Sequence, residues 1–121
     1  MLKIGKESET LFTIDLDGKI TAAEMNVELD KLLDMSADVK GGKLLYDVRN
    51  FQMPEFGALV VEFRKLPALL GLIRRFDKVA LLAEEAWLRK FAEWEGALFP
   101  GLEIRSFSHD GEQAALEWLM A

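Results

Sequence analysis

The sequence predicts a three-layer α/β/α domain with a mixed, mostly parallel sheet of about five strands flanked by about four helices. Two observations predict this class. Short apolar segments alternate with longer amphipathic ones, and after an opening hairpin each connection between strands exceeds the dozen residues that a parallel pair needs. In addition, the 121 residues show no internal repeat and no Pro/Gly/Ser-rich linker, so a single domain is expected over residues 1–121.

The chain opens with a predicted hairpin. Residues 11–16 are rich in β-branched and aromatic side chains. They end at Asp17 and Gly18, a pair typical of turns because glycine adopts positive φ without steric cost. Residues 2–4 (LKI) form a short segment, and we expect it to pair antiparallel with this strand.

A first helix is predicted over residues 22–35. Thr21 precedes Glu24 by three residues, the spacing of a capping box that satisfies two backbone N–H groups at a helix start. Apolar residues then recur at helical spacing on one face. Residues 44–48 follow as an apolar strand, as expected of a strand covered on both faces.

A second helix is predicted to begin near Pro54 and Glu55, because proline fits a first helical turn and a carboxylate there meets the helix dipole favourably. Its apolar pattern continues to Ile73, but Pro67 lies inside the pattern and should kink the helix or divide it in two. Both outcomes are open at this point. Residues 78–82 form the next predicted strand.

The last third of the chain repeats the alternation. A third helix is predicted from an apolar stripe formed by Trp87, Phe91, Trp94 and Leu98. Residues 102–107 alternate as the final strand, and Asp110 with Gln113 opens the last helix. We expect right-handed crossovers to place helices on both faces of the sheet.

Composition narrows the classes of function. The formal net charge of −6 argues against non-specific nucleic-acid binding, which needs cations to displace counterions from phosphates. The absence of cysteine and the single histidine, His109, disfavour thiolate or histidine-rich metal sites and a Ser-His-Asp triad, so neither metal nor cofactor is expected. We see no signal peptide and no apolar run long enough to span a membrane, and therefore expect a cytoplasmic location.

One motif suggests an enzyme. Residues 12–18 (FTIDLDG) look like the nucleophile motif of haloacid-dehalogenase-type phosphatases, in which Asp15 would attack a phosphoryl group and Asp17 would handle protons beside magnesium. The later strand ends do not supply the Ser or Thr, the lysine and the acidic pair that this chemistry also needs. The sequence therefore favours two solvated aspartates at a turn, and a phosphatase using Asp15 is a remote alternative.

Two other groups of polar residues are interpreted as structural rather than catalytic. Glu84 and Glu85 are adjacent, and neighbours one apart on a helix do not face each other, so they are interpreted as charges at a helix start. His109 precedes Asp110 near the last helix, which indicates a surface histidine at a helix start rather than a catalytic base.

Two segments are candidate binding surfaces. The first is the connection after a central strand, because ligands and partners of open α/β sheets gather at the carboxyl ends of strands. Its candidate residues are Arg49, Asn50, Phe51 and Glu55. The second is the stretch from 66 to 73, which is apolar on too many sides for one buried face and should line a cavity or meet a partner. Its candidate residues are Leu66, Leu69, Leu70 and Ile73.

The order of local motifs resembles the SpoIIAA-like family of small bacterial proteins, which have the STAS, or CRAL-TRIO-like, fold. Each motif is weak alone, and the likeness comes from their order over nearly the whole chain. The motifs are residues 18–21 (GKIT), 44–48 (LLYDV), 56–59 (FGAL), 75–80 (RFDKVA), Trp87 and 114–119 (AALEWL).

The resemblance implies a four-helix, mixed-sheet domain that binds rather than catalyses. Anti-anti-sigma members carry a phosphorylatable Ser or Thr at the start of the second helix, where a phosphate would disrupt partner docking. This chain has no Ser or Thr between Arg49 and Phe63, and Glu55 lies in that region. We therefore expect a cytoplasmic, non-enzymatic interaction or regulatory domain without that switch.

Partner classes follow from the same expectation. A protein partner or a second copy of the chain is expected, the latter as a homodimer through the apolar part of the second helix. The alternative is a carrier or sensor of a small apolar or lipid-like ligand. It is suggested by the apolar stretch beside Pro67 and by the kinship of the fold with lipid-transfer domains.

Overall fold

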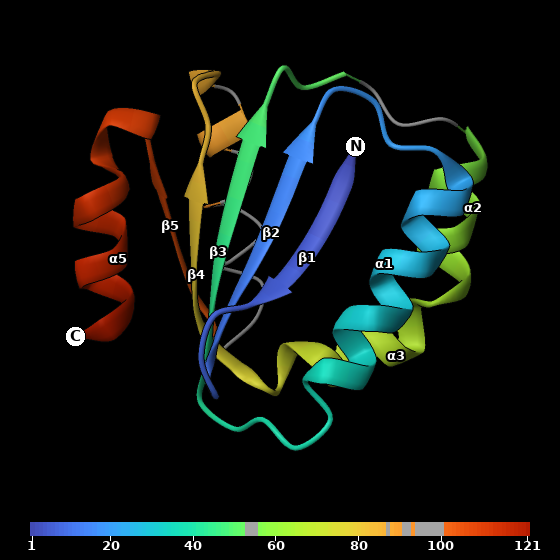
Figure 1. The fold of residues 1–121 in the computed structure, drawn as a ribbon, viewed down its shortest axis with the longest axis horizontal. Coiled ribbons are helices and arrows are strands. Elements are labelled where there is room, and N and C mark those ends of the chain that lie inside the picture. The colour runs from blue at the N-terminus through green and yellow to red at the C-terminus, as the bar shows by residue number, and fades with distance from the viewer. Residues whose placement is uncertain (53–55, 87, 91–92, 94–100) are drawn as a thin grey trace.

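The computed structural model describes residues 1–52, 56–86, 88–90, 93 and 101–121 (Figure 1). Strands and helices alternate after an opening hairpin, as the sequence predicts. The elements are β1 (Leu2–Lys6), β2 (Leu11–Asp17), α1 (Ala22–Met35), β3 (Gly42–Arg49), α2 (Phe56–Arg64), α3 (Leu66–Ile73), β4 (Phe76–Leu82), β5 (Glu103–Phe107), the 3-10 turn η1 (His109–Gly111) and α5 (Glu112–Met120).

The strands form one mixed sheet in the order β1-β2-β3-β4-β5. β1 pairs antiparallel with β2, and each later strand pairs parallel with its predecessor. Gly18 leaves β2 at a φ of +75°, which confirms the predicted glycine turn. The predicted fold class, a mixed and mostly parallel sheet between helices, is therefore confirmed.

Helices cover both faces of the sheet, but unequally. In Figure 1, α1, α2 and α3 lie on one side and, of the labelled helices, α5 lies on the other. The unequal division follows from the strand order. Successive right-handed crossovers between neighbouring parallel strands keep the intervening helices on the same face. Among the described helices, only α5, which follows the last strand, is free to pack on the opposite face.

The two faces enclose cores of different size. The larger core lies beneath α1 and α3 and includes Phe12, Ile4 and Leu72. The smaller one lies beneath α5, where Leu82 and Leu119 are fully buried. Side chains alternate along β2, so Phe12, Ile14 and Leu16 enter the larger core while the residues between them face the α5 side.

Helix α1 also closes the free edge of the sheet. The predicted capping box is present: the Glu24 backbone N–H donates to Thr21 Oγ1, and Glu24 Oε1 accepts from the Thr21 backbone N–H. In addition, the Leu2 backbone N–H donates to Glu24 Oε2 (2.9 Å), and the Ile4 backbone N–H donates to Glu28 Oε2 (3.1 Å). Two carboxylates of one helix thus occupy backbone donors of the edge strand β1.

Pro67 divides the predicted second helix. The hydrogen-bond pattern of α2 continues to Lys65, whose backbone N–H donates to the Val61 carbonyl (3.1 Å). Pro67 then occupies the first turn of α3, where its missing N–H leaves no helical acceptor unpaired. Of the two outcomes left open by the sequence, division is the one observed.

The predicted stripe of the third helix lies outside the described residues, as do Pro54 and Glu55. Trp87, Phe91, Trp94 and Leu98 belong to this group. The last predicted strand and helix are present as β5 and as η1 followed by α5. Among the described helices, none is long and apolar enough to cross a membrane.

Candidate functional site

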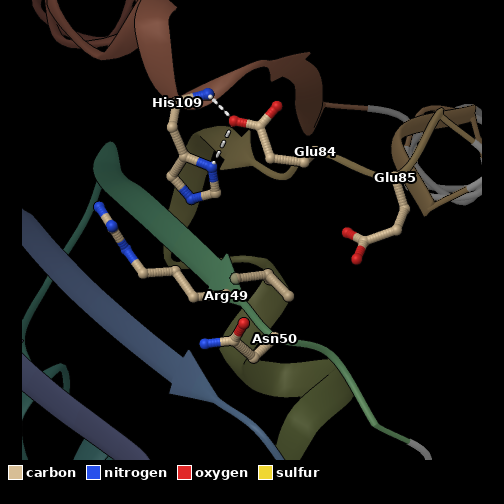
Figure 2. Close-up of a pocket in the computed structure, with 6 residues that line it drawn as sticks. Arg49, Asn50, Glu84, Glu85 and His109 are labelled. Carbon is tan, nitrogen blue, oxygen red and sulfur yellow. Dashed lines mark hydrogen bonds and ion pairs between the residues drawn. The ribbon is translucent and has the colours of Figure 1, made fainter.

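A cleft of about 400 Å³ opens at the carboxyl ends of the parallel strands. Three segments form it: the end of β3, the residues that follow β4, and the first residue of η1 after β5 (Figure 2). These strands are parallel, so the segments that leave them meet at one edge of the sheet. The described residues that line the cleft are Val48, Arg49, Asn50, Glu84, Glu85 and His109.

His109 lies between two carboxylates. Its Nε2 is 2.7 Å from Asp47 Oδ1, and its Nδ1 is 2.9 Å from Glu84 Oε1. The backbone N–H of His109 also donates to Glu84 Oε1 (3.2 Å), so that oxygen accepts twice from one residue (Figure 2). The single histidine of the chain thereby joins η1 to β3 and to the segment after β4.

The two carboxylates control the protonation of the ring. Burial is the largest single influence on the pKa of His109 and lowers it. The hydrogen bonds to Glu84 and Asp47 together outweigh burial and raise the pKa above its ordinary value. The same contacts lower the pKa of Glu84, first through the hydrogen bond from the ring and then through the one from the backbone. The geometry therefore favours an imidazolium between two ionised carboxylates.

Most donor atoms of the other cleft residues are also engaged. Arg49 Nε and Nη2 contact Asp47 Oδ2 at 3.4 and 3.3 Å, and these bonds raise the pKa of the guanidinium. Asn50 has a φ of 49°, in the left-handed region that asparagine tolerates better than most residues. Its Nδ2 donates to Asp17 Oδ1 (3.0 Å), which links the ends of β2 and β3.

Acceptor atoms, by contrast, remain unused in the cleft. Glu84 Oε2 makes no hydrogen bond with any described residue, and neither carboxylate oxygen of Glu85 does so. Figure 2 shows the Glu85 carboxylate directed into the space between the other labelled residues. The free acceptors of the cleft are therefore carboxylate oxygens that carry negative charge, while Arg49 keeps Nη1 as a donor that no described residue engages.

The structure places the phosphatase motif beside this cleft rather than in it. Asp15 lies directly across from Asp47 in the register of β2 and β3, on the α5 side of the sheet, and is absent from the cleft lining. Burial and the nearby Asp47 raise the pKa of Asp15, against the weaker opposite effect of Lys3 and Arg49. Within the described residues, no group of three or more His, Asp or Glu side chains is arranged to hold a metal ion.

The first predicted surface is divided by the structure. Arg49 and Asn50 line the cleft. Phe51 instead packs against the larger core. Glu55 lies outside the described residues.

The second predicted surface lies at the other end of the sheet. Helix α3 leads into the amino end of β4, whereas Arg49 stands at the carboxyl end of the parallel strand β3. Leu70 is 48% exposed there, and Ile73 is half-buried beside an apolar pocket of about 90 Å³. Leu66 and Leu69 also belong to α3, but the described structure does not include the placement of their side chains. The two predicted surfaces are thus not one continuous site.

Sequence reasoning missed the partners of Arg49 in the cleft. Glu84, Glu85 and His109 were interpreted as charges near helix starts, which is correct locally but incomplete. The sequence did contain a signal for their position, since Glu84 closely follows β4 and His109 closely follows β5. Applying the strand-end rule to those strands, and not to β3 alone, would have placed them beside Arg49.

Both ring nitrogens of His109 face carboxylate oxygens, so neither is free to accept a proton from a bound molecule. The fold and site define a small α/β domain with a charged cleft at the carboxyl ends of a mixed sheet. A model of the SpoIIAA-like family matches residues 11–120, and the chain belongs to that family.

Solved structures agree with this assignment at the level of the fold. An uncharacterised protein of Shewanella loihica PV-4 with a SpoIIAA-like fold is 18% identical, with a TM-score of 0.77 over 98% of this chain and 92% of that one. The anti-sigma factor antagonist SpoIIAA in its unphosphorylated form is 10% identical, with a TM-score of 0.55 over 100% and 99% of the two chains. Phosphorylated SpoIIAA, a Bacillus cell-fate determinant, is 11% identical, with a TM-score of 0.51 over 96% and 99%. A search of curated proteins gives no significant match.

Proposed function

We propose that this chain is a non-enzymatic regulatory domain that binds a protein partner through the cleft at the carboxyl ends of β3 and β4. The unused carboxylate oxygens of the cleft carry the proposal. Membership of the SpoIIAA-like family supports it, because a solved protein of that fold is an anti-sigma factor antagonist. The structure of this chain adds the chemistry of the surface that would receive the partner.

The proposed partner presents a basic segment. Glu84 Oε2 and the carboxylate of Glu85 are acceptors without partners among the described residues, whereas His109 already uses both ring nitrogens. Lysine and arginine side chains are the protein groups that offer only donors and a positive charge. A net charge of −6 also favours the approach of such a partner over that of an acidic one.

A peptide titration followed by NMR tests the proposal. Hexalysine is expected to shift the backbone amide signals of Asn50, Glu84, Glu85 and His109 in a saturable way, whereas hexaglutamate leaves them in place. Glu85→Gln removes one unpaired charge and should weaken hexalysine binding about three-fold, the effect of a unit charge at a few ångströms in a solvent-like dielectric.

The matched control is Glu9→Gln. Glu9 lies in the turn between β1 and β2, away from the cleft, and its side chain is 97% exposed. We expect this variant, which makes the same change of charge, to bind hexalysine like the wild type. Equal weakening by both substitutions would reveal a general effect of net charge and would overturn the assignment to the cleft.

A carrier of an apolar ligand is less well supported. The apolar pocket beside Ile73 has a volume of about 90 Å³ as lined by described residues. Sites for small molecules usually enclose roughly 300 Å³ or more. The pocket therefore does not favour this alternative over the charged cleft.

A further inference from the structure

The side chain of His109 makes contacts that only its charged form satisfies together. An ionised carboxylate offers acceptors and no donor, so a ring nitrogen beside it must carry a proton to form a hydrogen bond. His109 faces such a group at both nitrogens, Asp47 at 2.7 Å and Glu84 at 2.9 Å. The neutral ring has a single N–H, and one of the two contacts would then place two lone pairs against each other.

The two contacts differ in their surroundings. The side chain of Asp47 is 14% exposed, while that of Glu84 is 62% exposed. A hydrogen bond in the less exposed position is screened less by water, and its loss would leave a partly buried carboxylate unpaired. Apart from the ring, Glu84 is held only by the backbone N–H of His109 (3.2 Å), a bond that water can replace at this exposed position. Loss of the ring proton should therefore break the contact with Glu84 and keep the one with Asp47.

We propose that His109 is a charge-dependent latch on the cleft: as an imidazolium it holds the carboxylate of Glu84, and on losing its proton it releases that carboxylate towards the bound partner. The inference rests on the proposed function for its consequence, but not for the latch itself. The charged groups that face the ring are Asp47 and Arg49 from β3 and Glu84 from the segment after β4. Arg49 opposes the imidazolium and the two carboxylates favour it.

Release changes the cleft in two ways. Its charge becomes more negative by one unit, and Glu84 loses its ring contact, so that only the backbone N–H of His109 still holds it beside the unengaged Glu85. Both changes favour a cationic partner. Phosphorylated regulators of this fold are controlled by a covalently added charge. Here the charge of one half-buried ring would serve instead, and the connection from Arg49 to Phe63 contains no hydroxyl side chain.

The latch is tested directly by NMR titration of the intact protein. The chain has a single histidine, so ring signals need no assignment by mutation. We expect His109 to titrate above its ordinary value of 6.5, and the neutral ring to keep its proton on Nε2, which faces Asp47. A midpoint at or below 6.5, or a neutral ring protonated on Nδ1, would overturn the latch.

Two neighbouring glutamates supply the matched variants. Glu84→Gln removes a charged partner of the ring at an exposed position and should lower the midpoint. Glu85→Gln removes the adjacent charge, which makes no contact with the ring, and should move the midpoint less. Equal shifts in the two variants would mean that the ring responds only to the general negative charge, and the latch would be rejected.

Binding of hexalysine measures the consequence. Between about pH 6 and about pH 8.5 the wild type is expected to bind the peptide about three-fold more tightly, the effect of one unit charge near the ligand. His109→Gln cannot titrate in this range and should show no such increase. If hexalysine binds at neither pH, the proposed partner chemistry fails, and the ring titration alone decides on the latch.

Discussion

Two aspartates that lie side by side on the sheet have different environments. Asp47 accepts from His109 and Arg49, whereas Asp15, across from it on β2, forms no ion pair with a described residue and lies near the negative charge of Asp47. Burial and that charge raise the pKa of Asp15. A carboxyl whose pKa is higher in the folded than in the unfolded chain opposes folding once it is ionised.

Replacing Asp15 by asparagine should therefore stabilise the protein at neutral pH. The gain is about 0.5 kcal/mol after allowance for solvent screening, because the side chain is only partly buried. It should vanish as the pH falls below the pKa of the unfolded carboxyl, where the wild-type group is protonated in both states. Urea denaturation at about pH 7 and about pH 3 measures both values. A variant that is less stable than the wild type at neutral pH would contradict this account.

At the scale of elements, α1 does more than cover the sheet. Glu28 accepts from the backbone of Ile4, and Glu24 accepts from Leu2 while it also completes the capping box with Thr21. Hydrogen bonds to Leu2 and Thr21 lower the pKa of Glu24, although burial opposes them. One helix therefore depends on its carboxylates both for its own start and for its contact with β1.

Glu28→Ala should lower the free energy of unfolding by about 1 kcal/mol, the usual value of one hydrogen bond to a charged acceptor that is partly exposed. Glu24→Ala should cost about 1–2 kcal/mol, because the capping box is lost as well. Glu28→Gln keeps an oxygen acceptor and is expected to recover part of the loss. Urea denaturation compares the three variants. A Glu28→Ala protein as stable as the wild type would show that water replaces the contact without penalty.

Elements governed by local signals were predictable from the sequence. The capping residues Thr21 and Glu24 define the start of α1, and Gly18 ends β2, because each acts on its immediate neighbours. Pro67 allowed a kink or a division, and only packing decides between them. His109 was predicted only as a histidine at a helix start, for a related reason. Its partners Asp47 and Glu84 are distant in sequence, and no local pattern reports such a contact.

For the whole molecule, the consecutive crossovers leave α5 as the only described helix on its face. Its anchor, Leu119, is fully buried against Leu82 and its neighbours, whereas the adjacent Met120 is 60% exposed. The family assignment was predictable at this scale, because it depends on the order of motifs along the chain. The unequal coverage of the two faces was not expected, since the sequence indicated helices on both faces without indicating how they divide.

Leu119→Ala should cost about 2–5 kcal/mol, because it removes buried methyl groups and leaves a cavity beneath a single helix. Met120→Ala is the control and should change stability by less than about 0.5 kcal/mol. Amide hydrogen exchange of α5 provides the second measurement, since exchange in the leucine variant should accelerate first in this helix. Similar losses in the two variants would contradict the role of Leu119 as the anchor.

The carboxylates over β1 have a consequence for assembly. Filaments that grow strand against strand need two open margins on every subunit, one to receive the previous copy and one to present to the next. Here Glu24 and Glu28 already occupy backbone donors along one margin. Strand-to-strand association of this domain would therefore stop once a single pair had formed. The two carboxylates thus oppose the growth of fibres through its sheet.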